Sequence, residues 1–194
     1  MNDVIVPGKV QPEMFWKAYK SKLLQIASSA AKQAYRSDFE WTPYAMNAAM
    51  RAVESLGLVP QGEYFRLDAI GYERHGTHDW TLRVAFEHEN RDHWTDELCK
   101  LCHIVADLRV LVSYWNFKKD RNVETCVEGH LKKLESRIVK NPGKWLFIFG
   151  PRCKSFGADC PYVAYASDGK TLIKLEDDGG LNPFNWPDNG PGCH

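Results

Sequence analysis

The sequence has no excess of charge of either sign. Its 194 residues include 25 Lys and Arg against 25 Asp and Glu, so the formal net charge is zero. Such a chain has no overall field that attracts nucleic acid or acidic membranes, and any polyanion site must be a local patch. The length suits one domain with a substantial core.

Long apolar runs and dense cysteine patterns are missing as well. No run approaches the roughly 20 apolar residues of a membrane helix. The first residues, MNDVIVPGKVQPEMF, lack the basic start and apolar core of a signal peptide. Six cysteines are too few for a disulfide scaffold in a chain of this length. We therefore expect a cytoplasmic protein without a membrane partner, with its cysteines mostly reduced.

An alternation of helical and extended patterns is present instead. Apolar spacing predicts helices over residues 13–36, 43–56, 93–107 and 122–139, and Thr42 with Pro43 would begin the second. Polar–apolar alternation predicts strands 64–72 and 80–89, joined as a hairpin. Continuous apolar runs at 108–115 and 145–150 predict strands buried on both faces. This order implies right-handed crossovers and an α/β fold with a mixed sheet.

After Gly150 the long apolar runs give way to short hairpin and loop patterns. YVAYASDGKTLIKL predicts a small hairpin that turns at Asp168-Gly169, and the last sixteen residues are loop-forming. No linker separates the two parts. We expect one domain, with an N-terminal helix and core over residues 1–150 and a C-terminal extension over 151–194 packed on it.

Three carboxylates are predicted on one face of the hairpin formed by 64–72 and 80–89. Asp68 of the first strand, and Glu87 and Glu89 of the second, face away from the apolar side. A turn centred near Gly76 would put Asp68 roughly opposite Ala85, within reach of Glu87. Clustered carboxylates raise one another's pKa, and Mg²⁺ is a common reason to find them together. The alternative is a polar face in solvent. The expected apolar side comprises Phe65, Leu67, Ala69, Trp80, Leu82, Val84 and Phe86.

The helix after these strands carries Glu97 and Lys100, one turn apart. Lys100 either points back toward the acids or pairs with Glu97 on a solvated face, and the sequence leaves both open. The same helix would bury Trp94, Leu98, Leu101 and Val105.

This arrangement resembles the PD-(D/E)xK nuclease family: a hairpin Asp, Glu-x-Glu at the end of the next strand, then helix, buried strand, helix and strand. The family has the αβββαβ core of restriction endonucleases, and the resemblance covers roughly residues 43–150. Asp68 matches the motif's Asp and Glu87 its acidic position. Glu89 stands where the family usually has Lys, and Leu67 where Pro precedes the Asp. Lys100 suits those members that take the lysine from the following helix.

The resemblance implies hydrolysis of DNA with Mg²⁺ or Mn²⁺. Asp68 and Glu87 would bind the metal, Glu54 is the best match for a further ligand, and Glu63 is its alternative. Lys100 or Glu89 would orient or deprotonate the attacking water. Restriction-type cleavage of both strands usually needs two active sites, so a homodimer is a further expectation.

Two other functions stay open at this point. Because Glu89 replaces the usual lysine, the chain also fits a catalytically degenerate module that binds nucleic acid or a protein partner. A third interpretation is an accessory protein that works only through protein contacts.

Two further groups of residues have weaker patterns. Cys99-x-x-Cys102-His103 resembles half of a zinc site, but it lies inside a predicted helix, where buried reduced cysteines are the favoured interpretation. Basic side chains after the strand 108–115 are candidates for phosphate contacts, although a solvated surface is the favoured interpretation. These candidates for nucleic-acid binding are Lys118, Lys119 and Arg121. The favoured role of His88 is a packing histidine on the core side.

Overall fold

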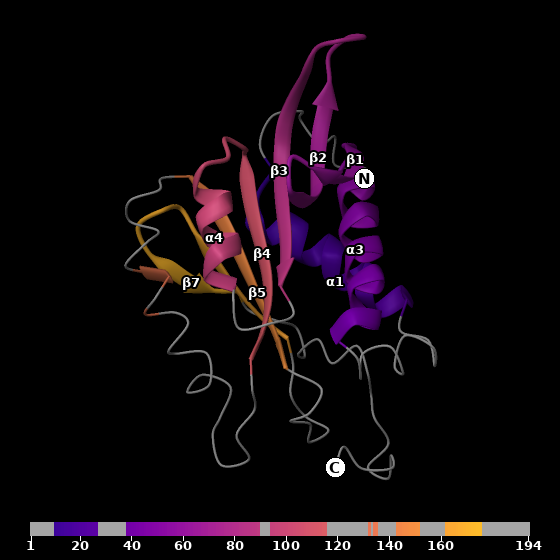
Figure 1. Ribbon diagram of the computed structural model, residues 1–194. Helices are drawn as coiled ribbons and strands as arrows, with labels where there is room; N and C mark the ends of the chain where they lie inside the picture. The colour runs from indigo at the N-terminus through magenta and orange to yellow at the C-terminus, as the bar shows by residue number, and fades with distance from the viewer. Residues whose placement is uncertain are drawn as a thin grey trace, which may run out of the picture.

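The computed structural model describes residues 10–26, 38–89, 94–115, 132, 134–135, 143–151 and 162–175. These residues form a mixed α/β fold in which one seven-stranded sheet has helices on both faces (Figure 1). The helices are α1 (Pro12–Ile26), α3 (Asp38–Ser55) and α4 (Trp94–Cys102). The strands are β1 (Val59–Tyr64), β2 (Leu67–Arg74), β3 (Trp80–Glu89), β4 (Leu108–Trp115), β5 (Lys144–Pro151), β6 (Val163–Ser167) and β7 (Leu172–Lys174).

The order of the strands in the sheet is their order in the chain, from β1 to β7. β1, β2 and β3 are antiparallel to one another, β3, β4 and β5 are parallel, and β6 and β7 return antiparallel. α4 makes the crossover from β3 to β4. The predicted α/β character with a mixed sheet is therefore confirmed, and the C-terminal hairpin β6–β7 continues the same sheet.

Two apolar clusters lie on opposite faces of this sheet. One joins α1 and α3 to residues such as Phe86 and Val110, and the other joins α4 to residues such as Ala85 and Leu111. Since successive strand residues point to opposite faces, a strand buried on both sides contributes to both clusters. The continuous apolar runs of β4 and β5 do so, as the sequence predicted.

The helix α3 begins earlier than predicted, at Asp38 rather than near Pro43, so Pro43 lies inside it. A contact with β4 stabilises the helix before the proline. The indole Nε1 of Trp41 donates a 2.7 Å hydrogen bond to the hydroxyl of Tyr114. A proline inside a helix removes one backbone hydrogen bond. This buried contact and the packing of Trp41 offset that loss.

The helix α4 ends sooner than predicted, at Cys102 rather than near residue 107. The backbone N–H groups of His103 and Ile104 bond to the carbonyls of Lys100 and Leu101, a tightened last turn that stops the helix. Val105, predicted to be buried, is 88% exposed in the loop that follows.

The predicted strand 64–72 is two strands, β1 and β2, joined by a turn at Phe65-Arg66. Both turn residues have positive φ, 48° and 65°, as in the type I′ turns that usually take Asn-Gly. Left-handed backbone costs an ordinary residue about 1–2 kcal/mol. Phe65 is 80% exposed, so its predicted place on the apolar side is wrong. No turn residue marks this position in the sequence.

The hairpin β2–β3 also has a different register from the one predicted. Arg74 pairs with Trp80, and an irregularity between Gly71 and Tyr72 shifts the pairing so that Ala69 meets Phe86. Asp68 is therefore level with Glu87 rather than with Ala85. At Gly71 the backbone passes so close to α3 that a Cβ atom would lie 2.7 Å from Val53 Cγ1.

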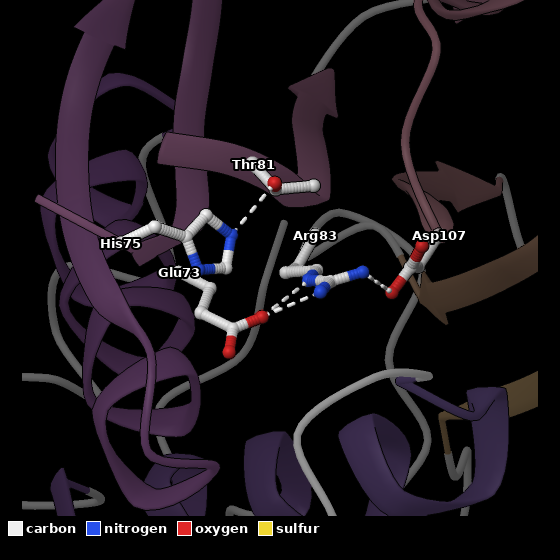
Figure 2. A network of polar contacts seen from close by, with 5 residues as sticks. All are labelled: Glu73, His75, Thr81, Arg83 and Asp107. Atoms are coloured by element: carbon white, nitrogen blue, oxygen red, sulfur yellow. Dashed lines mark hydrogen bonds and ion pairs between the residues drawn. The ribbon is translucent and has the colours of Figure 1, made fainter. Parts of the chain in front are cut away.

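A polar network ties this hairpin to the start of β4 (Figure 2). Arg83 reaches between two carboxylates, with Nε 2.9 Å from Glu73 Oε2 and Nη1 3.1 Å from Asp107 Oδ2. Nearby, His75 Nε2 lies 2.9 Å from Thr81 Oγ1. Because Asp107 directly precedes β4, the arginine fixes the far end of the hairpin relative to the parallel strands.

Several predictions fall on other parts of the chain. The turn at Asp168-Gly169 is confirmed between β6 and β7, with Gly169 at φ 91°. The predicted helix 122–139 is described only at residues 132, 134 and 135, which are helical. Lys118, Lys119 and Arg121 lie outside the described residues, as does the tail after residue 175. None of the helices in the described residues has the length and apolar composition of a membrane span.

Candidate functional site

Three acidic side chains and one lysine meet on the face of the sheet that α4 covers. Asp68 comes from β2, Glu87 from β3, and Glu97 and Lys100 from α4; we call these four residues the acid cluster. Lys100 Nζ lies 3.0 Å from Glu87 Oε1 and also forms an ion pair with Glu97. The structure therefore brings together three of the four catalytic residues predicted from sequence: Asp68, Glu87 and Lys100.

Backbone groups hold the cluster in place. The N–H of His88 donates a 2.7 Å hydrogen bond to Asp68 Oδ2, which joins β2 to β3 beside the two carboxyl groups. Lys100 Nζ donates to the carbonyl of Arg66 at 3.2 Å, so the β1–β2 turn is also part of the site. Lys100 thus contacts both glutamates and the backbone, which combines the two alternatives that the sequence left open.

The two strand carboxyl groups behave as a coupled pair that holds a proton. Burial, and then the negative charge of Asp68, raise the pKa of Glu87 to about 9, and its side chain is only 1% exposed. Burial also raises the pKa of Asp68, although the hydrogen bonds from His88 and Glu87 oppose that shift. Near neutral pH the pair therefore carries one proton, which resides mainly on Glu87.

Lys100 stays positively charged in this setting. Partial burial lowers its pKa, but the hydrogen bonds and charges of Glu97 and Glu87 outweigh burial, so the net shift in pKa is upward. A protonated amine donates hydrogen bonds and attracts anions, but it cannot accept a proton. Lys100 is therefore suited to orienting a water or holding a phosphate oxygen, not to acting as a base.

The remaining sequence candidates lie elsewhere. Glu89 ends β3 on the same face as Glu87, half-buried and level with Ser113 of β4. Glu54 is exposed on α3, which packs on the opposite face of the sheet. Glu63 is exposed in β1, the edge strand, with a positive φ of 47°. Neither Glu54 nor Glu63 has a recorded contact with the acid cluster among the described residues.

One residue of this site was undervalued from sequence, and a buried serine on the neighbouring strand β4 was missed. Glu97 was treated only as a partner of Lys100, yet its charge also acts on Asp68 and Glu87. Ser113 has a fully buried hydroxyl with no hydrogen-bond partner in the described part of the chain. A serine inside the apolar run LRVLVSYW was the available signal, because a buried hydroxyl normally needs a partner.

On the opposite face, behind the cluster, His88 is a buried packing histidine, as predicted. Its Nε2 lies 2.8 Å from the hydroxyl of Tyr114, which also accepts the hydrogen bond from Trp41. Burial lowers the pKa of His88 to about 3, so the imidazole is neutral. These contacts anchor the residue whose N–H holds Asp68.

We expect Tyr114→Phe to destabilise the fold by about 1–3 kcal/mol, because it leaves two buried polar groups, Trp41 Nε1 and His88 Nε2, without their shared partner. Thermal denaturation would show this as a fall in Tm of roughly 2–12 °C. Tyr44→Phe, which alters a half-buried ring stacked on Trp41, is the matched control and should leave Tm unchanged. Equal Tm values for wild type and Tyr114→Phe would contradict the role of this hydroxyl.

The two described cysteines, Cys99 and Cys102, belong to no group of metal ligands in the described part of the chain. Within the described ranges, no group of three or more His, Cys, Asp or Glu side chains is arranged to hold a metal ion. Cys99 is exposed and Cys102 half-buried on α4, and both are free thiols. Cys126 and His130, whose i, i+4 spacing would suit the other half of a zinc site, lie outside the described residues. The finding for the described ranges covers the acid cluster as well, where Asp68 and Glu87 supply two adjacent carboxyl groups rather than a complete set of metal ligands. The acid cluster is the candidate site because of the contacts described above.

No protein-family model matches the chain, and no curated protein matches it in sequence. The features that point to a function are the geometry of the acid cluster and the resemblance in motif and element order.

Proposed function

We propose that this protein hydrolyses phosphodiester bonds of DNA with the help of Mg²⁺ or Mn²⁺ at the acid cluster. The observation that carries the proposal is the meeting of Asp68, Glu87 and Lys100 from two adjacent strands and the following helix. These are the positions that the resemblance to PD-(D/E)xK nucleases matches to the family's motif residues.

The order of the elements supports the same proposal. From α3 to β4 the chain runs helix, three strands, helix, strand, which is the αβββαβ order of the restriction-endonuclease-like core. In that stretch β2 is antiparallel to its neighbours and β4 is parallel to β3. The two carboxylates stand on β2 and β3, the strands on which the family motif lies.

The donor set fits a hard divalent cation. Mg²⁺ in phosphoryl-transfer sites is often bound through one or two carboxylates, with waters and substrate phosphates completing its octahedron. Asp68 and Glu87 supply two adjacent carboxyl groups that already share a proton in place of a cation. They would hold the metal, and it would acidify a bound water and neutralise charge on the phosphate.

The other residues of the site have separate roles. The Lys100 ammonium, fixed by Glu97 and the Arg66 carbonyl, would orient the attacking water or bind a phosphate oxygen. Glu89, on the same face of β3, would accept the proton from that water. The hydrogen bond from the His88 N–H would keep Asp68 directed toward Glu87. The expected homodimer stays a prediction.

Asp68→Asn should abolish cleavage, with a loss of at least about 1,000-fold. Charge stabilisation by a bound metal contributes several kcal/mol to such a reaction, and every 1.36 kcal/mol is a factor of ten in rate. We would incubate the full chain with supercoiled plasmid, linear duplex, single-stranded DNA and RNA, in Mg²⁺, Mn²⁺ or EDTA. Cutting should need metal and disappear in the variant.

Glu54→Gln is the matched control, because it removes an acid that the resemblance offered as a ligand but that is exposed on α3. We expect it to cleave like wild type. Cleavage that persists in Asp68→Asn would refute the proposed site. Salt-dependent DNA binding without cutting would favour the degenerate module instead, with Glu89 in place of the usual lysine as the reason.

A further inference from the structure

Four aromatic rings form a continuous strip along β1, β2 and β3. Phe65 lies edge-on to Tyr64 with ring centroids 4.6 Å apart, Tyr64 to Trp80 at 5.6 Å, and Trp80 to Tyr72 at 5.5 Å. We call Phe65, Tyr64, Trp80 and Tyr72 the aromatic strip. Tyr64 and Tyr72 also pack against the apolar cluster beneath α4, so the strip lies on the same side of the sheet as the acid cluster.

The strip is open to solvent at both of its outward rings. Phe65 is 80% exposed and Trp80 is 41% exposed, while Tyr64 and Tyr72 beneath them are half-buried. The inner rings thus support the outer rings from below. An exposed, preformed row of rings offers flat faces to a ligand with flat groups of its own.

The turn at one end of the aromatic strip has an unfavourable backbone conformation. Phe65 and Arg66 both have positive φ, although neither is Gly or Asn. The result is to hold a phenyl ring in solvent, where it gains little from packing. Unfavourable backbone conformations of this kind concentrate at ligand-binding and active sites.

Two observations connect the strip to the acid cluster and to an anionic ligand. Lys100 Nζ donates to the carbonyl of Arg66, the residue next to Phe65, so one end of the strip abuts the cluster. Arg74 lies over the ring of Tyr72, with its guanidinium carbon 5.9 Å from the centroid, and Arg66 is exposed in the turn. Exposed arginines therefore accompany the rings near both ends of the strip.

We propose that the aromatic strip stacks with the unpaired bases of a single-stranded nucleic acid whose backbone passes the acid cluster. Bases stack on aromatic side chains without sequence preference, and nearby arginines contact the phosphates. A duplex hides the faces of its bases and cannot use the strip in this way. The inference rests on the proposed function, and it specifies the substrate as single-stranded or frayed rather than fully paired.

Phe65→Ala is the variant that tests this inference, because Phe65 is the most exposed ring and its recorded ring contact is with Tyr64 alone. Binding of a fluorescein-labelled thymidine 15-mer would be followed by anisotropy in EDTA, beside a duplex of the same length. We expect the variant to bind the single strand roughly 5- to 100-fold more weakly and the duplex equally well. Phe65→Trp should restore the affinity. Ile173→Ala, which trims a 62% exposed side chain on β7 at the other edge of the sheet, should bind like wild type.

Because binding is measured without metal, it is separable from cleavage. If wild type cuts nothing in Mg²⁺ but Phe65→Ala loses affinity for the single strand, the proposed function fails and the strip stands. If wild type cuts DNA but Phe65→Ala binds the 15-mer unchanged, or neither protein binds it, the strip has another role and the inference is overturned. A change from dimer to monomer in Phe65→Ala, with unchanged 15-mer binding, would likewise overturn it in favour of a protein interface.

Discussion

Mg²⁺ should bind this protein about a hundredfold more tightly at pH 8 than at pH 6 if Asp68 and Glu87 are its ligands. The pKa of Glu87 is raised to about 9, so the metal must displace a proton across this whole range. Competition with one proton changes the apparent affinity about tenfold for each pH unit below that pKa. Isothermal titration calorimetry at pH 6, 7 and 8 measures the affinity directly.

Calorimetry in two buffers of different ionisation enthalpy would also count the protons released, and we expect close to one. Glu87→Gln is the control: it should bind Mg²⁺ weakly and with little dependence on pH. The neutral imidazole of His88, buried on the other side of β3, should contribute nothing to the titration. Equal Mg²⁺ affinity of wild type at pH 6 and pH 8 would contradict the shared proton.

Without metal, the same glutamate should make the folded protein less stable as the pH rises. The pKa of Glu87 in the folded state lies above its ordinary value of 4.5, so the folded state keeps a proton that the unfolded state has lost. The free energy of unfolding therefore falls as the pH rises from about 4.5 to about 9. Glu87→Gln imitates the protonated side chain at every pH and removes this loss.

We accordingly expect Glu87→Gln to raise Tm by at least about 5 °C at pH 8.5 in EDTA, and to leave it nearly unchanged at pH 5. A change of 1 kcal/mol moves Tm by roughly 2–4 °C in a domain of this size. Thermal denaturation of both proteins at the two pH values decides the matter, with the exposed Glu54→Gln as a control that should follow wild type. A lower Tm for Glu87→Gln at pH 8.5 would show that the ion pair with Lys100 outweighs the burial of the carboxylate.

Much of the sheet was predictable because the apolar pattern of a strand indicates which of its faces are buried. The unbroken apolar runs of β4 and β5 correspond to strands with both faces buried. The alternation in β3 was misleading, because residues 84–88 are buried on both faces and Leu82 packs on the α4 side, opposite Val84 and Phe86. The turn at Phe65-Arg66 was not predictable, since neither residue favours positive φ and no Gly or Asn marks it. The start of α3 was missed because the contact that holds Trp41 comes from Tyr114, 73 residues away.

The candidate site was partly predictable for the same reasons. Alternation put Asp68 and Glu87 on one face, but their register depended on the irregularity between Gly71 and Tyr72, which the sequence did not predict. The direction of Lys100 could not be decided from a helical pattern. Its two partners are Glu97, one turn away on the same helix, and Glu87, which is distant in sequence. Whether Glu89 takes part in catalysis depends on chemistry that a motif does not specify.

The order of the strands has a consequence for how this protein acquires its structure. Since each strand pairs with its neighbour in the chain, the sheet can grow in the direction of synthesis, from β1 toward β7. Pairing of near neighbours keeps the loops to be closed short, which favours fast folding. α1 differs from the strands, because it precedes all of them in the chain and yet packs on β5 and β6 as well as on α3. Asp68 and Glu87 come level through the local β2–β3 pairing, whereas the burial that raises the pKa of Glu87 needs the later elements β4 and α4. The proton held by the pair is therefore a property of the completed sheet and not of the hairpin, and α4 brings Lys100 together with the burial.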